Sequence, residues 1–170
     1  MIVTIDIVQA DIFSALRALL VGIVGSTCEV VHGINNNTPA PLGDFVVFTP
    51  LFMERIETNV TSYSDPTPTT GKKRSTQPIK YPFQIDCYGC NAADNAAKIT
   101  TLWRDDYSCQ ALGGLCQPLT HTQPKLMPWI SSERNYTQRF EFELTLQYNP
   151  TTTTAMEFFD TATVAQLNQN

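Results

Sequence analysis

Apolar residues recur at steps of three and four through the first 25 residues of the chain, which is the spacing of one face of an α-helix. We expect this helix to be capped by Asp6, whose carboxylate can accept a backbone hydrogen bond, and to end at Gly22 or Gly25. The predicted inward stripe consists of Ile5, Val8, Ile12, Leu16, Leu19 and Ile23, widened by Phe13 and Leu20.

Strict alternation of apolar and polar residues predicts two long strands later in the chain. One runs over residues 79–88, with its apolar phase on the odd positions, and the other over residues 139–148, with its apolar phase on the even positions. Each is therefore expected to bury one face. Residues 45–49 are apolar on both phases, so a strand there should be covered on both faces.

A second helix is predicted to follow the strand that ends near Cys87. Asn91 is its expected N-cap, and Asp94 lies in the first turn, where negative charge is favourable. The inward stripe consists of Ala92, Ala96, Ile99, Trp103 and Tyr107. The order of elements predicts a single α+β domain over residues 1–150, with a largely antiparallel or mixed sheet and two main helices packed on one face.

Two segments carry no core pattern. Residues 64–78 contain three prolines, one glycine and the chain's basic cluster, and we expect a long mobile loop that joins two strands of a hairpin. Residues 151–170 begin with four threonines after Pro150 and are expected to form a Thr-rich C-terminal extension or arm.

Composition and charge narrow the possible functions. Charged residues make up 16% of the chain and the net charge is −5 at pH 7. An acidic chain whose basic residues cluster only at Lys72, Lys73 and Arg74 is a poor candidate for binding nucleic acid through its phosphates. The first residues do not resemble an export signal, and the apolar run at residues 12–24 contains Arg17 and is too short for a membrane span. We expect an intracellular, soluble protein.

Four of the five cysteines follow the spacing C-x2-C-x18-C-x6-C, at Cys87, Cys90, Cys109 and Cys116. The first pair has the spacing of a zinc knuckle, but the second pair is too widely spaced for the usual zinc ribbon. Cys87 also lies on the apolar phase of a predicted strand, where a thiol acts as a small hydrophobic group. We favour structural cysteines over a metal site, and expect no cofactor.

The usual catalytic motifs are absent from the sequence, including G-x-S-x-G, H-E-x-x-H and the glycine-rich phosphate loops. Two carboxylate pairs remain as candidates. Asp105 and Asp106 are expected at the end of the second helix, and Glu141 and Glu143 share the outer face of the last long strand. A solvated helix end and an interfacial strand face explain these pairs better than acid–base chemistry, so we expect a protein without catalytic activity.

The predicted strand, turn and helix start meet in one segment, Ile85-Asp86-Cys87-Tyr88-Gly89-Cys90-Asn91-Ala92-Ala93-Asp94. This segment resembles the tail terminator (tail completion) proteins of tailed bacteriophages, and more specifically the neck terminator group of contractile-tailed phages. The helix at the start, the Pro-rich segment and the Phe-Glu-Phe-Glu-Leu strand also follow in the order of that family.

The resemblance implies a structural virion protein without catalytic residues, assembled in the bacterial cytoplasm into a homo-oligomeric ring, usually a hexamer, at the tail–neck junction. Such a ring caps the tail tube, ends tail polymerisation and docks the neck and head, so its partners would be the tube, sheath and head-completion proteins. An acidic lumen would repel DNA and let it pass without specific binding. Candidate lumen residues are Asp105, Asp106, Glu141 and Glu143.

The resemblance also makes residues 64–78 a candidate contact with a neighbouring subunit or the tube, the alternative being a floppy surface loop. The contact candidates in this segment are Lys72, Lys73, Arg74, Thr76 and Pro78. The C-terminal arm is expected to add a strand to a neighbour. Three other interpretations stay open: another neck component, such as a head-completion, adaptor or tail-tube-like protein; a small zinc-binding module; and a hydrolase.

Overall fold

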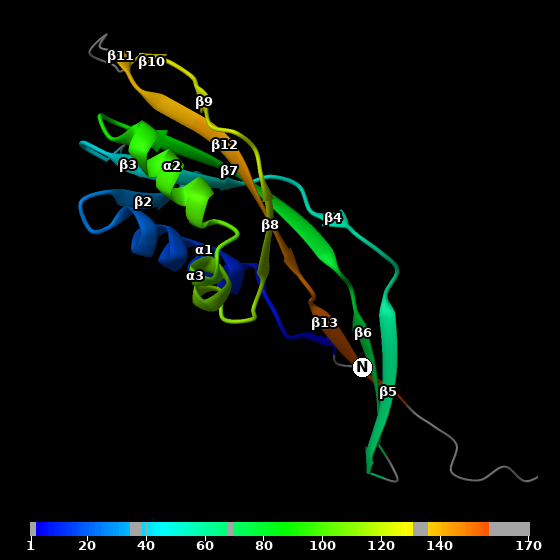
Figure 1. Cartoon of the computed structure of the whole chain (residues 1–170). Helices are drawn as coiled ribbons and strands as arrows, with labels where there is room; N and C mark the ends of the chain where they lie inside the picture. The colour runs from blue at the N-terminus through cyan, green and yellow to red at the C-terminus, as the bar shows by residue number, and fades with distance from the viewer. Residues whose placement is uncertain (1–2, 35–38, 40, 68–69, 131–135, 157–170) are drawn as a thin grey trace, which may run out of the picture.

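The computed structural model describes residues 3–34, 39, 41–67, 70–130 and 136–156 of the chain. Figure 1 shows an elongated molecule with helices and a seven-stranded sheet at one end and a four-stranded sheet projecting at the other. The architecture is α+β with mixed, largely antiparallel sheets, which confirms the predicted fold class. None of the helices in the described ranges combines the length and apolar character that a membrane crossing needs.

Helix α1 (Gln9–Val24) begins later than predicted. Its N-cap is Val8, whose backbone N–H donates to the Asp11 carboxylate at 3.1 Å. The predicted cap at Asp6 is therefore wrong: Asp6 instead accepts a 2.7 Å hydrogen bond from the N–H of Thr151. The predicted end at Gly25 is confirmed.

The buried stripe of α1 follows the predicted period but is shorter at its start. Ile5 belongs to a strand before the helix, and Val8 is exposed at the helix start. From residue 12 onward the three- and four-residue spacing does bury one face against the large sheet. The buried residues of the helix are Ile12, Leu16, Leu19, Leu20 and Val24.

Strands β7 (Ile79–Tyr88) and β12 (Arg139–Tyr148) pair antiparallel along their whole length at the centre of the seven-stranded sheet. Their apolar phases face the helices, which confirms both predicted strands and their buried faces. Strand β2 runs parallel to β3, while the other described pairings of this sheet are antiparallel. The remaining strands are β2 (Glu29–His32), β3 (Phe45–Pro50), β4 (Glu54–Arg55), β8 (Gln117–His121) and β9 (Lys125–Leu126).

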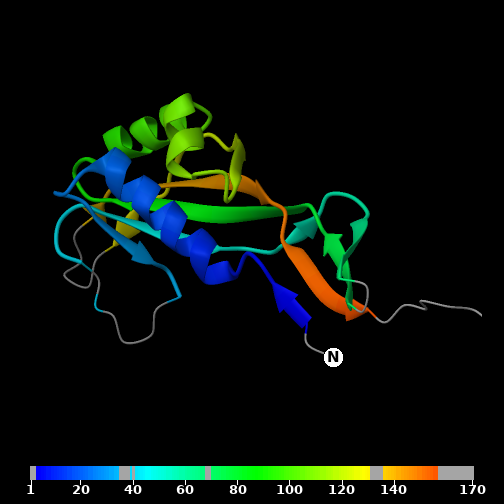
Figure 2. The same ribbon diagram turned by 90° about the horizontal axis from the view of Figure 1, so that it is seen from below.

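Helices α2 (Ala92–Leu102) and α3 (Asp106–Ala111) lie with α1 on one face of this sheet, as Figure 2 shows. Asn91 is the N-cap of α2, as predicted. Trp103 is fully buried at the C-terminal end of α2, where its indole N–H donates to the backbone oxygen of Thr120 on β8 at 3.1 Å. Tyr107 was predicted to point inward but is 45% exposed, because the chain breaks after α2 and restarts as α3.

The segment predicted as a mobile loop is largely a hairpin. Strands β5 (Val60–Thr67) and β6 (Thr70–Thr76) pair antiparallel, so the expectation of a structureless loop over residues 64–78 is wrong. Strands β1 (Val3–Ile5) and β13 (Thr151–Met156) complete a four-stranded antiparallel sheet in the order β1-β13-β6-β5. A further short hairpin joins β10 (Trp129–Ile130) and β11 (Tyr136–Thr137).

The two sheets are connected by two short breaks, each ending in proline. Strand β6 leads to β7 across Gln77 and Pro78, and β12 leads to β13 across Asn149 and Pro150. The N–H of Gln77 donates to the oxygen of Pro150 at 3.1 Å, so the breaks lie beside one another. Proline lacks an N–H and interrupts a ladder, which explains why both strands leave the large sheet at this level.

The first six residues of the predicted C-terminal arm form β13, which pairs with β6 and β1 of its own chain. The prediction that the arm adds a strand to a neighbour is therefore wrong for residues 151–156, which pair within their own chain. Residues 157–170, the remainder of the arm, lie outside the described part of the structure.

Candidate assembly surfaces

One face of the large sheet is covered by the helices, and the opposite face carries a polar cluster. Successive side chains of a strand point to opposite faces of a sheet. In β7 and β12 the residues that alternate with the buried apolar ones therefore point to the helix-free face. Glu141 lies opposite Asp86, and Glu143 lies opposite Gln84, in the register of the two strands. We call Gln84, Asp86, Arg139, Glu141 and Glu143 the sheet-face cluster.

An ion pair organises the sheet-face cluster. Asp86 is only 4% exposed, and the Arg139 guanidinium donates to its Oδ1 at 2.9 Å. Arg139 also lies 3.5 Å from the Glu141 carboxylate, and Gln84 donates to the second oxygen of Asp86 at 2.9 Å. Burial lowers the pKa of Arg139, but the hydrogen bond and charge of Asp86 outweigh it and raise that pKa overall.

Aromatic rings support the same guanidinium. The guanidinium carbon (Cζ) of Arg139 lies 5.7 Å from the centre of the Tyr88 ring. The Tyr88 ring stacks on the Phe45 ring, with 4.5 Å between the two ring centres. A cation above an aromatic face gains electrostatic attraction. Arg139 is thus held by carboxylates and a ring and is neutralised on this face, whereas Glu143 has no ion pair among the described residues.

The other predicted carboxylate pair lies elsewhere. Asp105 is the N-cap of α3 and Asp106 lies in its first turn, so the expectation that they end the second helix is wrong. Negative charge is favourable at a helix N-terminus. The Asp106 carboxylate accepts a 2.5 Å hydrogen bond from Gln110. The structure therefore separates Asp105 and Asp106, in the helical layer, from Glu141 and Glu143 on the opposite side of the sheet.

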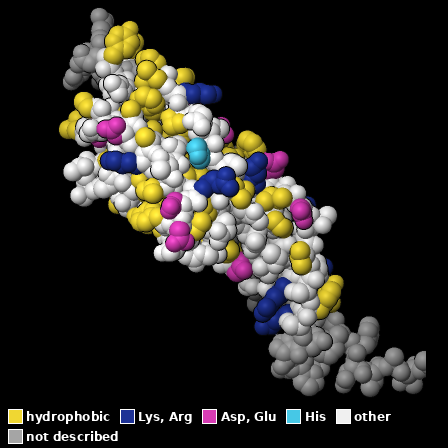
Figure 3. Space-filling model, viewed as in Figure 1, with side chains coloured by type: hydrophobic (Ala, Val, Ile, Leu, Met, Phe, Trp, Pro, Cys, Tyr) yellow, Lys and Arg dark blue, Asp and Glu magenta, His cyan; other side chains and the backbone are white. Residues whose placement is uncertain are grey.

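The four-stranded sheet carries most of the predicted contact residues. Lys72, Lys73, Arg74 and Thr76 all lie on β6, and Pro78 follows it. None of the three cations forms an ion pair with the described residues. Figure 3 shows Lys and Arg side chains beside apolar ones at this end of the molecule.

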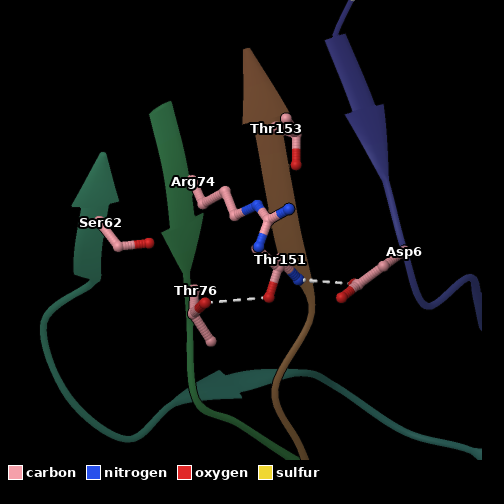
Figure 4. Close-up of a pocket in the computed structure, with 6 residues that line it drawn as sticks. All are labelled: Asp6, Ser62, Arg74, Thr76, Thr151 and Thr153. Atoms are coloured by element: carbon pink, nitrogen blue, oxygen red, sulfur yellow. Dashed lines mark hydrogen bonds between the residues drawn. The ribbon is translucent and has the colours of Figure 1, made fainter. Parts of the chain in front are cut away.

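One face of this sheet is hollowed around Arg74, as Figure 4 shows. The hollow has a volume of about 450 Å³. The Thr76 and Thr151 hydroxyls are 2.9 Å apart, and Asp6 closes one side through its bond to Thr151. Hydroxyls and a guanidinium around a shallow surface suit polar contact with another protein rather than enclosure of a small molecule. The lining residues are Asp6, Ser62, Arg74, Thr76, Thr151 and Thr153.

A second hollow, of about 630 Å³, lies where the two sheets meet. Ile5, Val8 and Met53 line it and are all substantially exposed. Tyr148 also lines this hollow, and its hydroxyl donates to the Met53 sulfur at 3.3 Å. Sequence reasoning missed this apolar surface, because its residues come from β1, the helix start and the segment after β3, which only the folded chain brings together.

The cysteines are not gathered at one place. Cys87 and Cys116 are buried, Cys90 is exposed and Cys109 is intermediate, and all four are free thiols. The described part of the chain contains no group of three or more His, Cys, Asp or Glu side chains placed to hold a metal ion. Burial raises the pKa of Cys87, and it raises that of Cys116 to about 11.

This burial predicts an alkaline dependence of stability. Because the pKa of Cys116 rises from 9.0 to about 11 in the folded protein, the unfolded chain loses this proton at lower pH. The free energy of unfolding should fall between these two pH values, by at most about 1.4 kcal/mol per pH unit for this one group. Denaturant titrations across the range measure the slope.

Cys116→Ala should make that slope shallower, whereas Cys90→Ala, at an exposed site, is the matched control. Equal slopes for the wild-type protein and Cys116→Ala would contradict the assigned burial effect.

Comparison with known proteins places this fold in a family. Residues 10–170 match the family described as phage neck terminator protein, which confirms the predicted resemblance. The match includes the segment after β13. No curated protein sequence matches the chain.

The solved structures that are similar to the chain include two components of larger assemblies. The first is the sheath/tube terminator of an extracellular contractile injection system, PVC, in the extended state, with a TM-score of 0.52 and 8% identity over 96% of this chain and 64% of that chain. The second belongs to the virion of a native gene transfer agent particle, with a TM-score of 0.33 and 17% identity over 85% and 94% of the two chains. The first likeness concerns the fold alone, and the second is too weak to carry weight.

The family match covers nearly all of the described chain, from the second residue of α1 through β13, and leaves out β1. The family is one of virion components of the tail–neck region. The chain belongs to the phage neck terminator protein family.

Proposed function

We propose that this protein assembles into a ring, expected to be a hexamer, at the tail–neck junction of the phage particle. The ring caps the last layer of the tail tube, stops its polymerisation and presents a docking surface for the neck and head. The observation that carries the proposal is the family match over residues 10–170. The tube, sheath and head-completion proteins are the proposed partners.

The projecting four-stranded sheet suits a role in contact between proteins. It extends away from the helical layer, so both its faces and both its edges are accessible (Figure 1). Its Lys72, Lys73 and Arg74 side chains have no carboxylate partners among the described residues. Unpaired cations on an accessible sheet can pair with acidic groups of a neighbouring protein, which favours specificity and correct orientation.

The role is structural in this proposal, and no residue is assigned a chemical step. The family is one of virion components, and the carboxylate pairs have structural explanations. Asp86 and Glu141 neutralise Arg139, and Asp106 lies at the N-terminus of a helix.

We assign Glu141 and Glu143 to the wall of the ring lumen. DNA that moves through a ring is retarded by unpaired cations, because each one attracts a phosphate. In the sheet-face cluster the single guanidinium is paired, and Glu143 remains free among the described residues. With three carboxylates against one guanidinium, the sheet-face cluster is negatively charged and repels phosphates, although Lys125 on β9 lies opposite Glu141. Asp105 and Asp106 lie on the other side of the sheet and are not part of this assignment.

Reversing these charges tests the lumen assignment. The double variant Glu141→Lys and Glu143→Lys removes two negative charges and adds two positive ones per subunit, and we expect it to slow DNA ejection while particles still assemble. Ejection is followed by release of DNA from purified particles on receptor addition. The control for charge reversal elsewhere is Glu57→Lys, which changes the charge by half as much at an exposed carboxylate outside this face. Loss of tube binding with unchanged ejection from the assembled particles would contradict the lumen assignment.

The location of the protein tests the proposed function directly. Cryo-electron microscopy of intact particles should show one ring of this fold between the last tube layer and the neck. Labelling of an epitope tag by gold-conjugated antibody gives an independent location. Density in the baseplate, or along the whole tail tube, would contradict the proposal.

A further inference from the structure

The four-stranded sheet ends in two open edges. Strand β1 pairs only with β13, and β5 pairs only with β6, within the described part of the chain. Proteins usually protect an open edge with charged residues, proline or a bulge. The first five residues of β5, Val60 to Ser64, contain neither charge nor proline, and the irregularity of this strand comes after them.

From these edges we propose that β5 of one copy pairs with β1 of the next copy, so that the four-stranded sheet continues from subunit to subunit. The inference rests on the proposed ring and names the surface that closes it. The occupant of each edge is a second copy of this chain, and the contact is head-to-tail, because the two edges are different.

Strand polarity agrees with this contact. All three pairings in the order β1-β13-β6-β5 are antiparallel, so the strand direction reverses at each step. After three reversals, β5 runs antiparallel to β1. A neighbour in the same orientation presents its β5 antiparallel to β1. The joined sheet therefore keeps the alternating polarity that each copy has internally.

The side chains at the two edges also match by face. Directly paired residues of antiparallel strands point to the same side of a sheet. Val3 on β1 pairs with Thr154 on β13, Thr154 pairs with Lys73 on β6, and Lys73 pairs with Tyr63 on β5. Val3 and Tyr63 therefore lie on the same face of the sheet, at opposite edges. Ile5 lies on that face too. Their exposed fractions are 59% for Val3, 52% for Ile5 and 66% for Tyr63.

Between these edges the same face is polar, with Lys73, Ser75, Thr152 and Thr154 on the inner strands. Apart from Met156 near the end of β13, the exposed apolar side chains of this face lie at its two edges, and joining β1 to a neighbour's β5 brings those together. On the other face, Thr4 and Ser62 occupy the two ends of one row, so hydroxyls meet hydroxyls. If the register between β1 and the neighbour's β5 shifts by two residues, each side chain stays on the same face. A shift of one residue moves every side chain of one strand to the other face.

Disulfide trapping in assembled particles tests the contact. Thr4→Cys and Ser62→Cys are placed on one chain that also carries Cys90→Ser, and the chain complements a phage with an early stop codon in this gene. After oxidation of purified particles, we expect a ladder of multimers on a non-reducing gel. Val60→Cys and Ser64→Cys replace Ser62→Cys to sample the registers two residues away on the same face.

The controls separate this contact from others. Thr4→Cys with Thr61→Cys places the thiols on opposite faces and should give no ladder. Dimers from Ser62→Cys alone would indicate a symmetric β5–β5 contact and overturn the proposal. Normal particles that contain the protein, with no ladder from any same-face pair, would also overturn it while leaving the proposed function intact. Normal tails on the uncomplemented stop-codon phage would overturn the proposed function.

A charge placed on the edge gives a second readout. Val3→Asp puts a carboxylate in the joined apolar row, and we expect its incorporation into particles to fall at least about tenfold, equivalent to about 1.4 kcal/mol per contact. Tyr136→Asp, at an exposed tyrosine on β11 of the other sheet region, is the matched control. Unchanged thermal unfolding of purified Val3→Asp excludes misfolding, and wild-type incorporation of that variant would contradict the contact.

Discussion

Replacing Trp103 with alanine is expected to lower the free energy of unfolding by about 4 kcal/mol, the cost of removing a large buried aromatic side chain. Trp103 is fully buried at the end of α2, and its indole N–H donates to Thr120 on β8. The variant therefore leaves a cavity between the helical layer and the sheet, and it also removes the partner of a backbone oxygen. Denaturant titration monitored by far-ultraviolet circular dichroism measures the change.

Two variants bracket this result. Trp103→Phe keeps most of the volume but loses the hydrogen bond, and its effect should lie well below that of alanine. Tyr136→Ala removes an exposed ring and should change the free energy by less than about 0.5 kcal/mol. A Trp103→Ala variant as stable as Tyr136→Ala would contradict the packing of α2 against the sheet.

Replacing Arg139 with methionine is expected to lower the free energy of unfolding by about 3 kcal/mol, because it leaves the Asp86 carboxylate buried without its partner. The long apolar side chain keeps much of the packing over Tyr88, so the loss of charge accounts for the change. Replacing both residues, with Asp86→Leu and Arg139→Met, should recover much of the stability. Denaturant titrations of the wild-type protein, Arg139→Met, Asp86→Leu and the double variant form a double-mutant cycle.

The exposed ion pair between Lys80 and Glu54 is the matched control. Its atoms are 3.7 Å apart and both side chains are largely in solvent. Lys80→Met should cost no more than about 0.5 kcal/mol. If Arg139→Met costs no more than Lys80→Met, the sheet-face cluster is not held by a buried ion pair.

The large sheet could be predicted because each central strand buries one face. Phe83 and Ile85 on β7, and Phe142 and Leu144 on β12, point to the helices, and the period of two reflects that burial. The second helix was predicted for a similar reason, since Ala96, Ile99 and Trp103 pack inward. Local pattern is sufficient where a single face of an element meets the core.

The four-stranded sheet could not be predicted from such patterns. Its strands are Thr- and Ser-rich and bury little on either face, so no apolar alternation marks them. Their stability comes from pairing between residues far apart in sequence, such as Thr76 with Thr151 and Val3 with Thr154. Pro66 and Gly71 indicated a loop, yet they lie within strands near the end of the hairpin. The C-terminal arm was expected to add a strand to a neighbour, so the pairing of β13 with β6 of its own chain was missed.

The candidate surfaces were predicted in part. Glu141 and Glu143 were placed together on an outer strand face, as the structure has them. Their connection to Asp86 through Arg139 needed the register of β7 and β12, which alternation alone does not provide. Asp105 and Asp106 were misplaced because the break between α2 and α3 carries no proline or glycine to mark it.

Tail length in a phage that lacks the protein shows whether the protein ends tail polymerisation. Particles made with an early stop codon in this gene, and the same phage complemented with the wild-type gene, are compared by electron microscopy. A terminator at the tube–neck junction predicts overlength tails, or heads and tails that fail to join, with normal particles on complementation. Normal-length tails beside leaking heads would assign the protein to head completion instead, and intact, infectious particles without it would contradict a terminator function.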